Sequence, residues 1–456
     1  MIPASTGTSD ANAIGLTYAA NGKKVNTNSA STYAATYTAG DIIGVGVDMD
    51  AATLTFYKNG VSQGVAFSSI STTTTWFASV CQRSSGTWYL NFGQRPFAYT
   101  PPTGFKALHT GNLPDSTIVD GSKHFDAVTW TSDGTDQFIS TGFDPDFLWY
   151  KSRTQASDHY LIDVLRSGAL NTNNTDAEGG GGGSSNLGTG GFTINAASSG
   201  NNIVGWNWKA GGTGVTNTDG SITSTVSANP TAGFSIVTYT GTRTSDAGET
   251  GTPTTIGHGL GVKPAMVITK ARETTTSGNW NVWHVGYQPD QVYLNYQLFL
   301  NTPAGSNNAG WQRTDTGFSS TTFCPARYSY DDVSGIDYVA YCFAEVESYS
   351  KFGSYVGNGS SDGTFVYTGF RPAFVMVKRS SGVDNWAIFD TSRLGYNPDN
   401  NELLANTSGT EGTADFIDIV SNGFKNRNAD TRCNASGSTY IYMAFAENPF
   451  KNSLAR

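Results

Sequence analysis

Apolar residues along this chain come in short runs of a few residues, separated by polar and glycine-rich stretches. Within many runs apolar and polar positions alternate with a period of two, as in "TLTFYK" from Thr53 to Lys58. This period is typical of β-strands that bury one face. We find no sustained apolar pattern at helical spacing. The pattern therefore predicts a chain that is nearly all β.

One segment occurs three times, and each copy has a glycine, a proline, an apolar run and a basic end. The copies are "GFDPDFLWYKSR" (142–153), "GLGVKPAMVITKAR" (259–272) and "GFRPAFVMVKR" (369–379). A hairpin pattern precedes each copy, and a second strand, a Gly-Phe pair and an aromatic-rich alternating strand follow it. Trp280 and Phe318 are separated by the same number of residues as Trp386 and Phe424. This equal spacing indicates internal duplication.

These landmarks predict tandem antiparallel β-sandwich modules of the jelly-roll or concanavalin-like type. Residues 96–122 are rich in Pro, Gly and turn residues, and we interpret them as a linker that docks onto its neighbours. The predicted domains are a partial sandwich with the docking linker at 1–114 and three repeats at 115–232, 233–347 and 348–456.

The first domain carries a recognisable pattern. The segments "GDIIGVGVDMDAATLTFYKNG" (40–60) and "WYLNFGQRPF" (88–97) resemble the second half of a SPRY domain, a β-sandwich that usually recognises proteins. The resemblance implies several more strands before "YAANGKK" (18–24) than this chain provides. A half-sandwich exposes a sheet edge and an apolar face. We therefore expect either a truncated domain or one that another chain or module completes.

Charge and hydropathy narrow the classes of partner. The net charge is −9 and the pI is about 5.0, which argues against nucleic acid because phosphate binding needs clustered Lys and Arg. No run approaches the length of a membrane span, and the N-terminus lacks the pattern of a secretory signal. Cys81, Cys324, Cys342 and Cys433 have no zinc-site spacing, so we interpret them as buried free thiols.

Paired carboxylates are the main candidates for catalysis, since glycosidases use two carboxyl groups across a cleft. The local pairs are Asp48–Asp50, Asp144–Asp146, Asp331–Asp332 and Glu345–Glu347. They occur in a turn or beside proline and loop residues, and no standard catalytic motif is present, so we expect no enzyme activity and no cofactor. Calcium binding by the Asp-rich loop "YSYDDVSG" (328–335) stays an open alternative.

Another carboxylate recurs together with an arginine. Asp163 is followed three residues later by Arg166, and Asp390 is followed by Arg393 at the matching place of the third repeat. The second repeat has His284 there instead. An essential catalytic carboxylate would be present in every copy of a working site, so we predict structural ion pairs.

Most tryptophans lie on alternating strands and are expected in the core. Trp311 is the exception, because it lies in the polar loop "NNAGWQRTD" (307–315). We predict that Trp311, Asn307 and Asn308 contact a glycan, through ring stacking and hydrogen bonds to hydroxyl groups.

The repeats, together with "FGQRPFAYTPPTGFKALHTGNLP" (92–114), resemble segments of structural proteins of tailed bacteriophages, notably marine and cyanobacterial ones. The resemblance implies a non-enzymatic virion protein of a tail fibre or other appendage, made in the host cytoplasm and released by lysis. It implies contacts with other virion proteins, a homo-oligomer such as a trimer, and a host-surface glycan or receptor, without nucleic acid or membrane insertion. Two alternatives stay open: a tailspike polysaccharide depolymerase, and a SPRY-type protein-binding adaptor.

Overall fold

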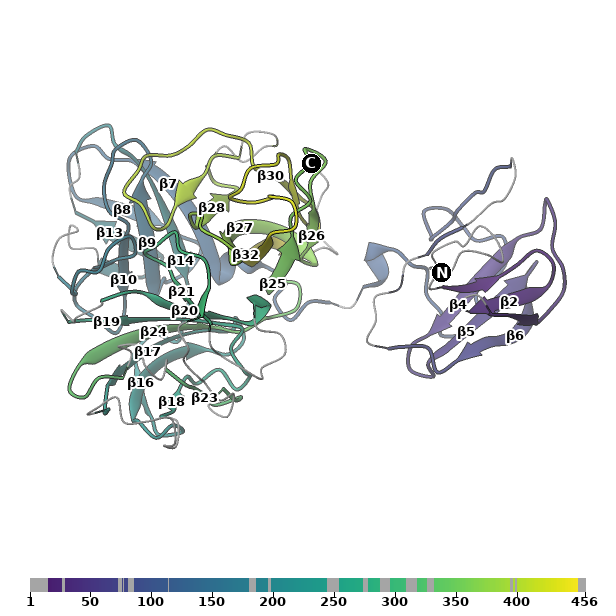
Figure 1. Cartoon of the computed structure of the whole chain (residues 1–456), viewed down its shortest axis with the longest axis horizontal. Helices are drawn as coiled ribbons and strands as arrows, with labels where there is room; N and C mark the ends of the chain where they lie inside the picture. The colour runs from purple at the N-terminus through teal and green to yellow at the C-terminus, as the bar shows by residue number, and fades with distance from the viewer. Residues whose placement is uncertain are drawn as a thin grey trace. The chain divides into compact units, whose positions relative to one another are not determined.

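The computed structural model forms two compact units, Met1–Pro114 and Asp115–Arg456 (Figure 1). Antiparallel strands build both units, and the described ranges hold three short 3-10 helices but no α-helix, which confirms the all-β prediction. None of the described residues forms a helix long and apolar enough to cross a membrane. The structure describes residues 15–26, 29–72, 76, 78–80, 86–113, 115–179, 186–195, 198–243, 254–273, 278–287, 296–308, 318–325, 332–393, 397 and 400–449.

The first unit contains two three-stranded antiparallel sheets. One sheet holds β1 (Leu16–Tyr18), β2 (Lys23–Asn26) and β3 (Ser29–Thr32), and the other holds β4 (Ile43–Asp48), β5 (Thr53–Lys58) and β6 (Val61–Ser68). Tyr18, Leu54 and Phe56 form the centre of its core. The tight turn between β5 and β6 has positive φ at Asn59 and Gly60, as expected for the "KNG" signal.

The proline-rich segment after this sheet packs on its outer face. A Cβ atom on Gly60 would lie 2.6 Å from the ring of Tyr99, and one on Gly46 would lie 3.2 Å from the ring of Phe105. The glycines therefore make room for two aromatic rings of the predicted docking linker. Other apolar side chains of the unit stay in solvent: Val45 is 49% exposed and Val61 is 65% exposed.

In the second unit each repeat builds a large antiparallel sheet with the same strand order, in which the closing strand of the repeat pairs with its opening strand and with its apolar strand. The first sheet has the order β7 (Phe125–Thr131), β14 (Asn202–Trp208), β9 (Phe147–Ser152), β10 (Tyr160–Asp163) and β11 (Leu170–Asn171). The second has β17 (Phe234–Thr240), β24 (Asp337–Phe343), β19 (Met266–Ala271), β20 (Asn281–His284) and β21 (Tyr296–Phe299). The third has β25 (Ser350–Val356), β32 (Thr439–Pro449), β27 (Phe370–Arg379), β28 (Ala387–Asp390) and β29 (Leu403–Leu404).

The second sheet is extended at both edges. β22 (Asn307–Asn308) pairs with β21 at one edge. At the other edge β15 (Val215–Asn217) and β16 (Ser224–Asn229) pair in series onto β17. Residues 115–232 were predicted to form the first repeat, but hydrogen bonding places the strands within 215–229 in the sheet of the second.

A smaller sheet lies on the outer face of each large one. In the first repeat Leu148 and Tyr150 of β9 pack with Phe192 of the small sheet. Each repeat is thus a two-layer sandwich, as predicted. The small sheets have the orders β8 (Gln137–Ser140), β13 (Gly191–Ile194), β12 (Asn186–Gly188); β18 (Ile256–Gly257), β23 (Thr322–Phe323); and β26 (Phe365–Tyr367), β31 (Gly423–Asn426), β30 (Ile417–Val420).

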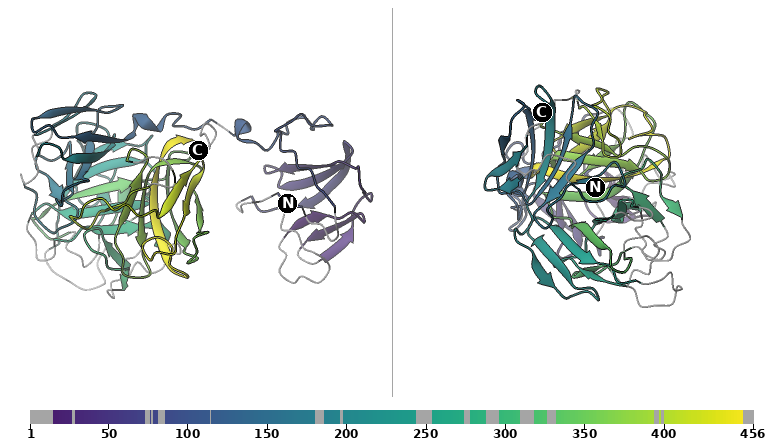
Figure 2. Two further views of the ribbon diagram at one scale, coloured as in Figure 1. Left: turned by 90° about the horizontal axis from the view of Figure 1, so that it is seen from above. Right: turned by 90° about the vertical axis from the view of Figure 1, so that its left-hand side faces the viewer.

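The three large sheets lie around a common centre (Figure 2). Buried residues on the inner faces of all three form one shared hydrophobic core. The ring centroid of Trp208 in the first repeat lies 6.3 Å from that of Phe343 in the second and 5.6 Å from that of Phe374 in the third. Each repeat is therefore a sandwich whose large sheet also packs against the large sheets of the other two repeats. The repeats are not separate modules that follow one another in series. Both faces of β9 are buried along its whole length, which explains its unbroken apolar run.

Candidate functional site

The repeated Asp-Arg pairs lie at the ends of β10 and β28 and are fully buried. Arg166 Nε donates to Asp163 Oδ2 at 2.7 Å, and Arg393 Nε donates to Asp390 Oδ2 at 2.7 Å. The other oxygen of Asp163 accepts a hydrogen bond from the backbone N–H of Leu165 at 2.9 Å. The Asp-x-x-Arg spacing thus closes a tight turn after the strand, and the arginine neutralises the carboxylate it buries.

Each pair also contacts the next repeat. The hydroxyl of Tyr341 donates to Asp163 Oδ2 at 2.8 Å, and Trp206 Nε1 donates to Asp390 Oδ2 at 2.9 Å. Tyr341 and Trp206 occupy the same position in the closing strands β24 and β14. The carboxylate of one repeat therefore binds a donor on the closing strand of its neighbour.

The second repeat makes the equivalent contact with different chemistry. The matching position in β32 is Met443, which has no hydrogen to donate. His284 replaces the aspartate, and its Nδ1 accepts a hydrogen bond from the N–H of Gly286 at 2.9 Å. Its Nε2 therefore carries the proton and donates to the carbonyl oxygen of Tyr442 at 3.0 Å. Burial lowers the pKa of His284 to about 4, so the ring is neutral at pH 7.

These three contacts form a closed cycle, in which the first repeat binds the second, the second binds the third and the third binds the first. A second cycle runs in the opposite direction, so that the first repeat binds the third, the third binds the second and the second binds the first. Its donors lie four residues before Asp163, His284 and Asp390. His159 Nε2 donates to the Leu404 carbonyl at 3.0 Å, Trp280 Nε1 to the Asn171 carbonyl at 2.8 Å, and Trp386 Nε1 to the Phe299 carbonyl at 2.9 Å. This cycle was not predicted from the sequence, although His159, Trp280 and Trp386 share one position in the three copies and could have indicated it.

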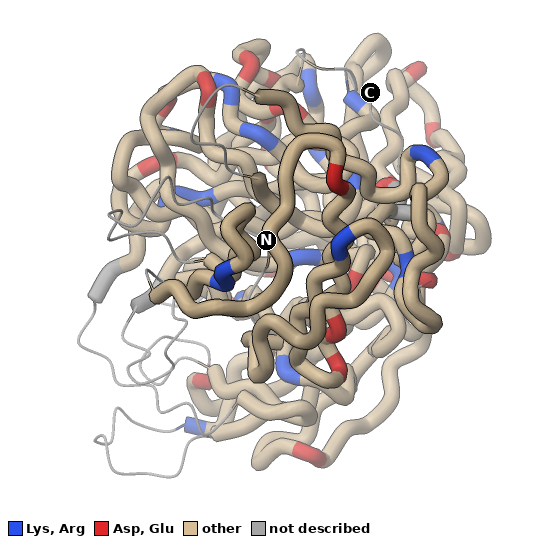
Figure 3. The backbone as a smooth tube through the Cα atoms, turned by 90° about the vertical axis from the view of Figure 1, so that its right-hand side faces the viewer, with Lys and Arg blue, Asp and Glu red and all other residues tan. Residues whose placement is uncertain are grey.

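Among the residues that the structure describes, two of the three repeat interfaces carry a longer chain of charges. Glu178 Oε2 lies 3.6 Å from Arg166 Nη1 and 2.5 Å from Nε of Arg272 in the second repeat. Together with Asp163 these residues form a four-membered network across the interface. Its counterpart between the third and first repeats is Asp390, Arg393, Glu411 and Arg153, with Glu411 at 3.0 Å from Arg393 and 2.9 Å from Arg153. Figure 3 shows acidic and basic residues interspersed along the chain. The eight residues of these two networks form ion pairs within and between repeats.

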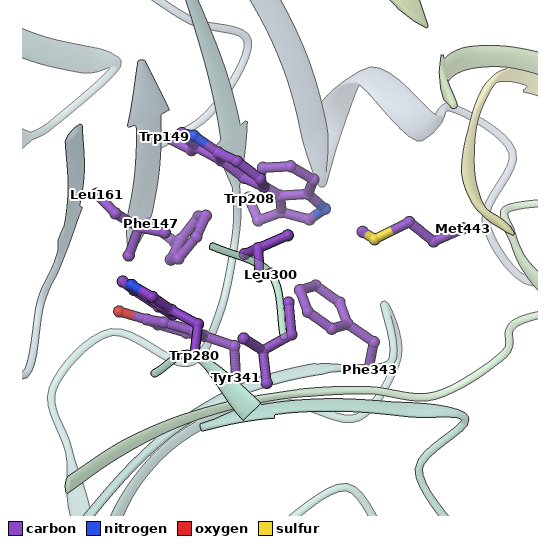
Figure 4. Close-up of a pocket in the computed structure, with 10 residues that line it drawn as sticks. Phe147, Trp149, Leu161, Trp208, Trp280, Leu300, Tyr341, Phe343 and Met443 are labelled. Carbon is purple, nitrogen blue, oxygen red and sulfur yellow. The ribbon is translucent and has the colours of Figure 1, made fainter. Parts of the chain in front are cut away.

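A small apolar pocket lies where the inner faces of the three repeats meet. Figure 4 shows Phe147, Trp208 and Trp280 around this space, together with Tyr341 and Met443. Its volume is about 10 Å³, close to that of one water molecule, and its lining is apolar. It is a packing imperfection in the shared core and has no room for a ligand.

The predicted glycan site is only partly within the described residues. Asn307 and Asn308 form β22, which pairs with Gln297 and Tyr296 at the edge of the second sheet. Trp311 lies outside the described residues. Glycan contact by these three residues stays a prediction.

Where the structure describes contacts of the local carboxylate pairs, the carboxylates accept hydrogen bonds from backbone N–H groups or form an ion pair with a lysine. Asp48 Oδ1 accepts hydrogen bonds from the N–H groups of Asp50 and Ala51 at 3.0 and 2.8 Å. Asp144 binds the N–H of Gly190 at 2.7 Å. Further along, Asp146 binds Gly212, Asp332 binds Thr242 and Glu345 pairs with Lys351.

Asp331 lies outside the described residues, as does most of the loop considered for calcium. Among the residues that are described, no group of three or more His, Cys, Asp or Glu side chains is placed to hold a metal ion. Cys324, Cys342 and Cys433 are buried free thiols, as predicted, while Cys81 falls outside the described residues.

Comparisons with known proteins divide the chain at the same place as the structure. A SPRY domain matches residues 5–95, and a family described as "Domain of unknown function (DUF7483)" matches residues 120–449. An E3 ubiquitin-protein ligase of Arabidopsis thaliana, RKP, is 35% identical over 96 residues, which are 20% of this chain and 7% of the ligase. The chain thus spans about 7% of the length of this curated relative. No solved structure matches the chain.

The family match covers the strands of all three repeats, well over half of the sequence. The protein therefore belongs to the family described as "Domain of unknown function (DUF7483)" and carries a SPRY domain at its N-terminus.

Proposed function

We propose that this protein is a non-enzymatic structural component of a bacteriophage virion, located in a tail fibre or another appendage, which also recognises the host surface. The resemblance of the repeats to structural proteins of tailed phages supports this assignment. The observation that carries it is the pair of closed hydrogen-bond cycles through which the three sandwiches hold one another.

A closed cycle suits a mechanical role. Each repeat is bound to both of its neighbours through buried polar groups, so no interface opens without leaving a donor or acceptor unpaired in the core. An unpaired buried group costs about 1–3 kcal/mol, and more if it is charged. Resistance to local opening is what an exposed appendage needs, because it meets shear and proteases outside the cell.

The SPRY domain supports the recognition part of the proposal. Domains of this kind usually bind proteins, and in this chain the unit forms its own core separate from the repeats. We propose that it contacts another virion protein or a host receptor, and that the full chain assembles as a homo-oligomer such as a trimer.

The direct test locates the protein in the particle. Purified virions are analysed by mass spectrometry and then imaged by electron cryomicroscopy, with an antibody against the repeats as a label. We expect peptides from this chain in the purified particle and label on an appendage. Its absence from particles, together with its presence in the infected-cell lysate, would exclude a virion role.

A second assay separates this function from that of a depolymerase. The purified protein is incubated with host capsule or lipopolysaccharide, and reducing ends are followed over time. The proposal expects no increase over a heat-denatured sample. Steady release of sugar would identify an enzyme and contradict the non-enzymatic assignment.

A further inference from the structure

The outer sheet of the third repeat presents two aromatic side chains to solvent. Phe365 and Tyr367 on β26 are 45% and 57% exposed, while Val366 between them is 5% exposed and packs in the core. β26 and β30 lie on the outside of the second unit (Figure 1). The period of two thus points one valine inward and two rings outward.

The outward face continues across the sheet as two rows. Lys425 on β31 is paired opposite Phe365, and Asp418 on β30 is opposite Lys425. Gly423 is opposite Tyr367, and a Cβ atom there would lie 2.0 Å from the Val366 carbonyl oxygen. Only glycine fits at this position, so the sheet beside Tyr367 carries no side chain that could cover the ring.

The charges on this face are paired. Lys425 pairs with Asp362, and Arg427 Nε lies 3.0 Å from Asp418 Oδ2. The second oxygen, Asp418 Oδ1, is buried and makes no hydrogen bond to any residue that the structure describes, so it does not face the solvent. The face therefore combines two aromatic rings with exposed polar groups, those of Asp362, Lys425 and Arg427, while its charges balance.

We propose that this surface, the β26 face formed by Phe365, Tyr367, Lys425 and Asp418, binds neutral carbohydrate. Aromatic rings pack well against the C–H faces of sugar rings, and the flanking carboxylate and basic groups suit hydroxyl groups. Residues two apart on a strand are separated by about 7 Å along the backbone, so the two aromatic residues can contact neighbouring sugar units of one chain. Balanced charges give no advantage to an ionic ligand.

A protein partner fits this surface less well. Stable protein interfaces bury about 800 Å² on each side, whereas two rings in a three-stranded sheet offer a small, flat area. The inference rests on and extends the proposed function, because it names a ligand class for host-surface recognition and places it on other strands than the one that holds Asn307 and Asn308.

The first repeat supplies a natural control. Phe138 of β8 corresponds to Phe365 and is 59% exposed, but Ser140 occupies the position of Tyr367. A Cβ atom on Gly191 would lie 2.9 Å from the Phe138 ring, so that single ring leans over the sheet. The third repeat therefore has the paired platform and the first does not.

The test uses the full chain and a panel of neutral oligosaccharides built from glucose, galactose and N-acetylglucosamine, with sialylated and sulfated oligosaccharides as a second panel. Binding is measured by saturation-transfer NMR and calorimetry. We expect wild type to bind at least one neutral member, and Tyr367→Ser and Phe365→Ala to weaken that binding about tenfold, equivalent to about 1.4 kcal/mol. Phe138→Ala is expected to leave the affinity within about twofold.

Three results would overturn the inference: no binding of wild type to any neutral member at about 10 mM, equal losses in Phe138→Ala and Tyr367→Ser, or binding confined to the charged panel. Circular dichroism verifies that each variant is folded. These measurements use purified protein, so they stand whether or not the chain is found in virions. Absence from virions would overturn the proposed function alone.

Discussion

At the scale of single residues, the buried polar side chains of the second unit show how one position adapts to its partner. Asp163 and Asp390 accept from Tyr341 and Trp206, whereas His284 faces a strand with methionine at that position and donates to a backbone carbonyl instead. Repeats that diverge in sequence thus retain an inter-repeat hydrogen bond by exchanging acceptor for donor. The absence of aspartate from the second copy follows from this exchange.

Removing the arginine of a buried pair should be severe. Arg393→Met leaves Asp390 charged in the core with only the Trp206 donor and backbone groups, and we expect a loss of about 3–5 kcal/mol in the free energy of unfolding. Tyr341→Phe removes the hydrogen bond that the hydroxyl donates to Asp163 and the one that it accepts from Arg166 Nη2, and should cost about 1–3 kcal/mol. Urea denaturation followed by tryptophan fluorescence measures both.

The matched control for this pair is the exposed ion pair of Lys425 with Asp362. Asp362→Asn should leave the urea midpoint unchanged, since exposed pairs contribute little. If Arg393→Met were as mild as Asp362→Asn, the inter-repeat network would have no role in stability.

The buried histidines predict acid sensitivity. Burial lowers the pKa of His284 to about 4 and that of His159 to about 3. In the unfolded chain both histidines have their usual pKa of about 6.5, so between these values the unfolded chain binds more protons than the folded chain. Stability contributed by these groups is therefore present above about pH 6.5 and falls as the pH drops toward the folded pKa, by about 1.4 kcal/mol per pH unit for each histidine. Unfolding in urea at pH 7 and pH 4.5 tests this, and His284→Gln should reduce the difference. An equal pH dependence in the variant would contradict the assignment.

At the scale of elements, each apolar strand ends in a lysine that is buried with it. Lys151, Lys270 and Lys378 close β9, β19 and β27, and each ammonium group donates to the carbonyl of the following residue, at 2.7, 2.8 and 2.6 Å. The basic residue at the end of the repeated segment is thus buried, and its ammonium group satisfies a backbone carbonyl at the end of the strand. Lys378 also reaches the Pro303 carbonyl of the second repeat at 3.2 Å.

These lysines predict a rise in stability in mild alkali. Burial lowers the pKa of Lys151 and Lys270 to about 8 and that of Lys378 to about 7. Between these values and the ordinary lysine pKa, the unfolded chain holds more protons than the folded one, so stability should increase as the pH rises from about 7 to 10. The urea midpoint at pH 7 and pH 9.5 measures the effect. Lys270→Met should diminish the increase, whereas Lys425→Met on the surface should not, and an increase unaffected by Lys270→Met would refute this explanation.

At the scale of the whole molecule, the second unit is stabilised by a hydrophobic core to which all three repeats contribute. Phe374, Met443 and Phe445 of the third repeat are almost fully buried in the core shared with the other two. A repeat taken by itself would expose this inner face to water. Its outer sandwich layer would be the only apolar layer left intact.

We therefore expect that residues 348–456 expressed alone do not fold cooperatively, while residues 115–456 do. Near-ultraviolet circular dichroism and urea titration distinguish the two outcomes: the longer fragment should give a sharp transition and the single repeat a broad one or none. A sharp transition in the isolated repeat would mean that its own sandwich layer is sufficient. In that case the common core would not be needed for folding.

The sequence alone determined the strands, the threefold repetition, the two-layer sandwiches and the pairing of Asp with Arg three residues later. All of these depend on spacing within one repeat, where the period of two and short-range turn chemistry are enough. The tertiary structure decided which face meets which repeat, that β15 and β16 join the second sheet, and that His284 takes the place of an aspartate because Met443 lies opposite it. The contacts between repeats join segments more than a hundred residues apart, and an apolar strand face specifies that it will be buried without specifying the surface that buries it. β15 and β16 instead pair with strands close to them in sequence, across the predicted boundary between two repeats.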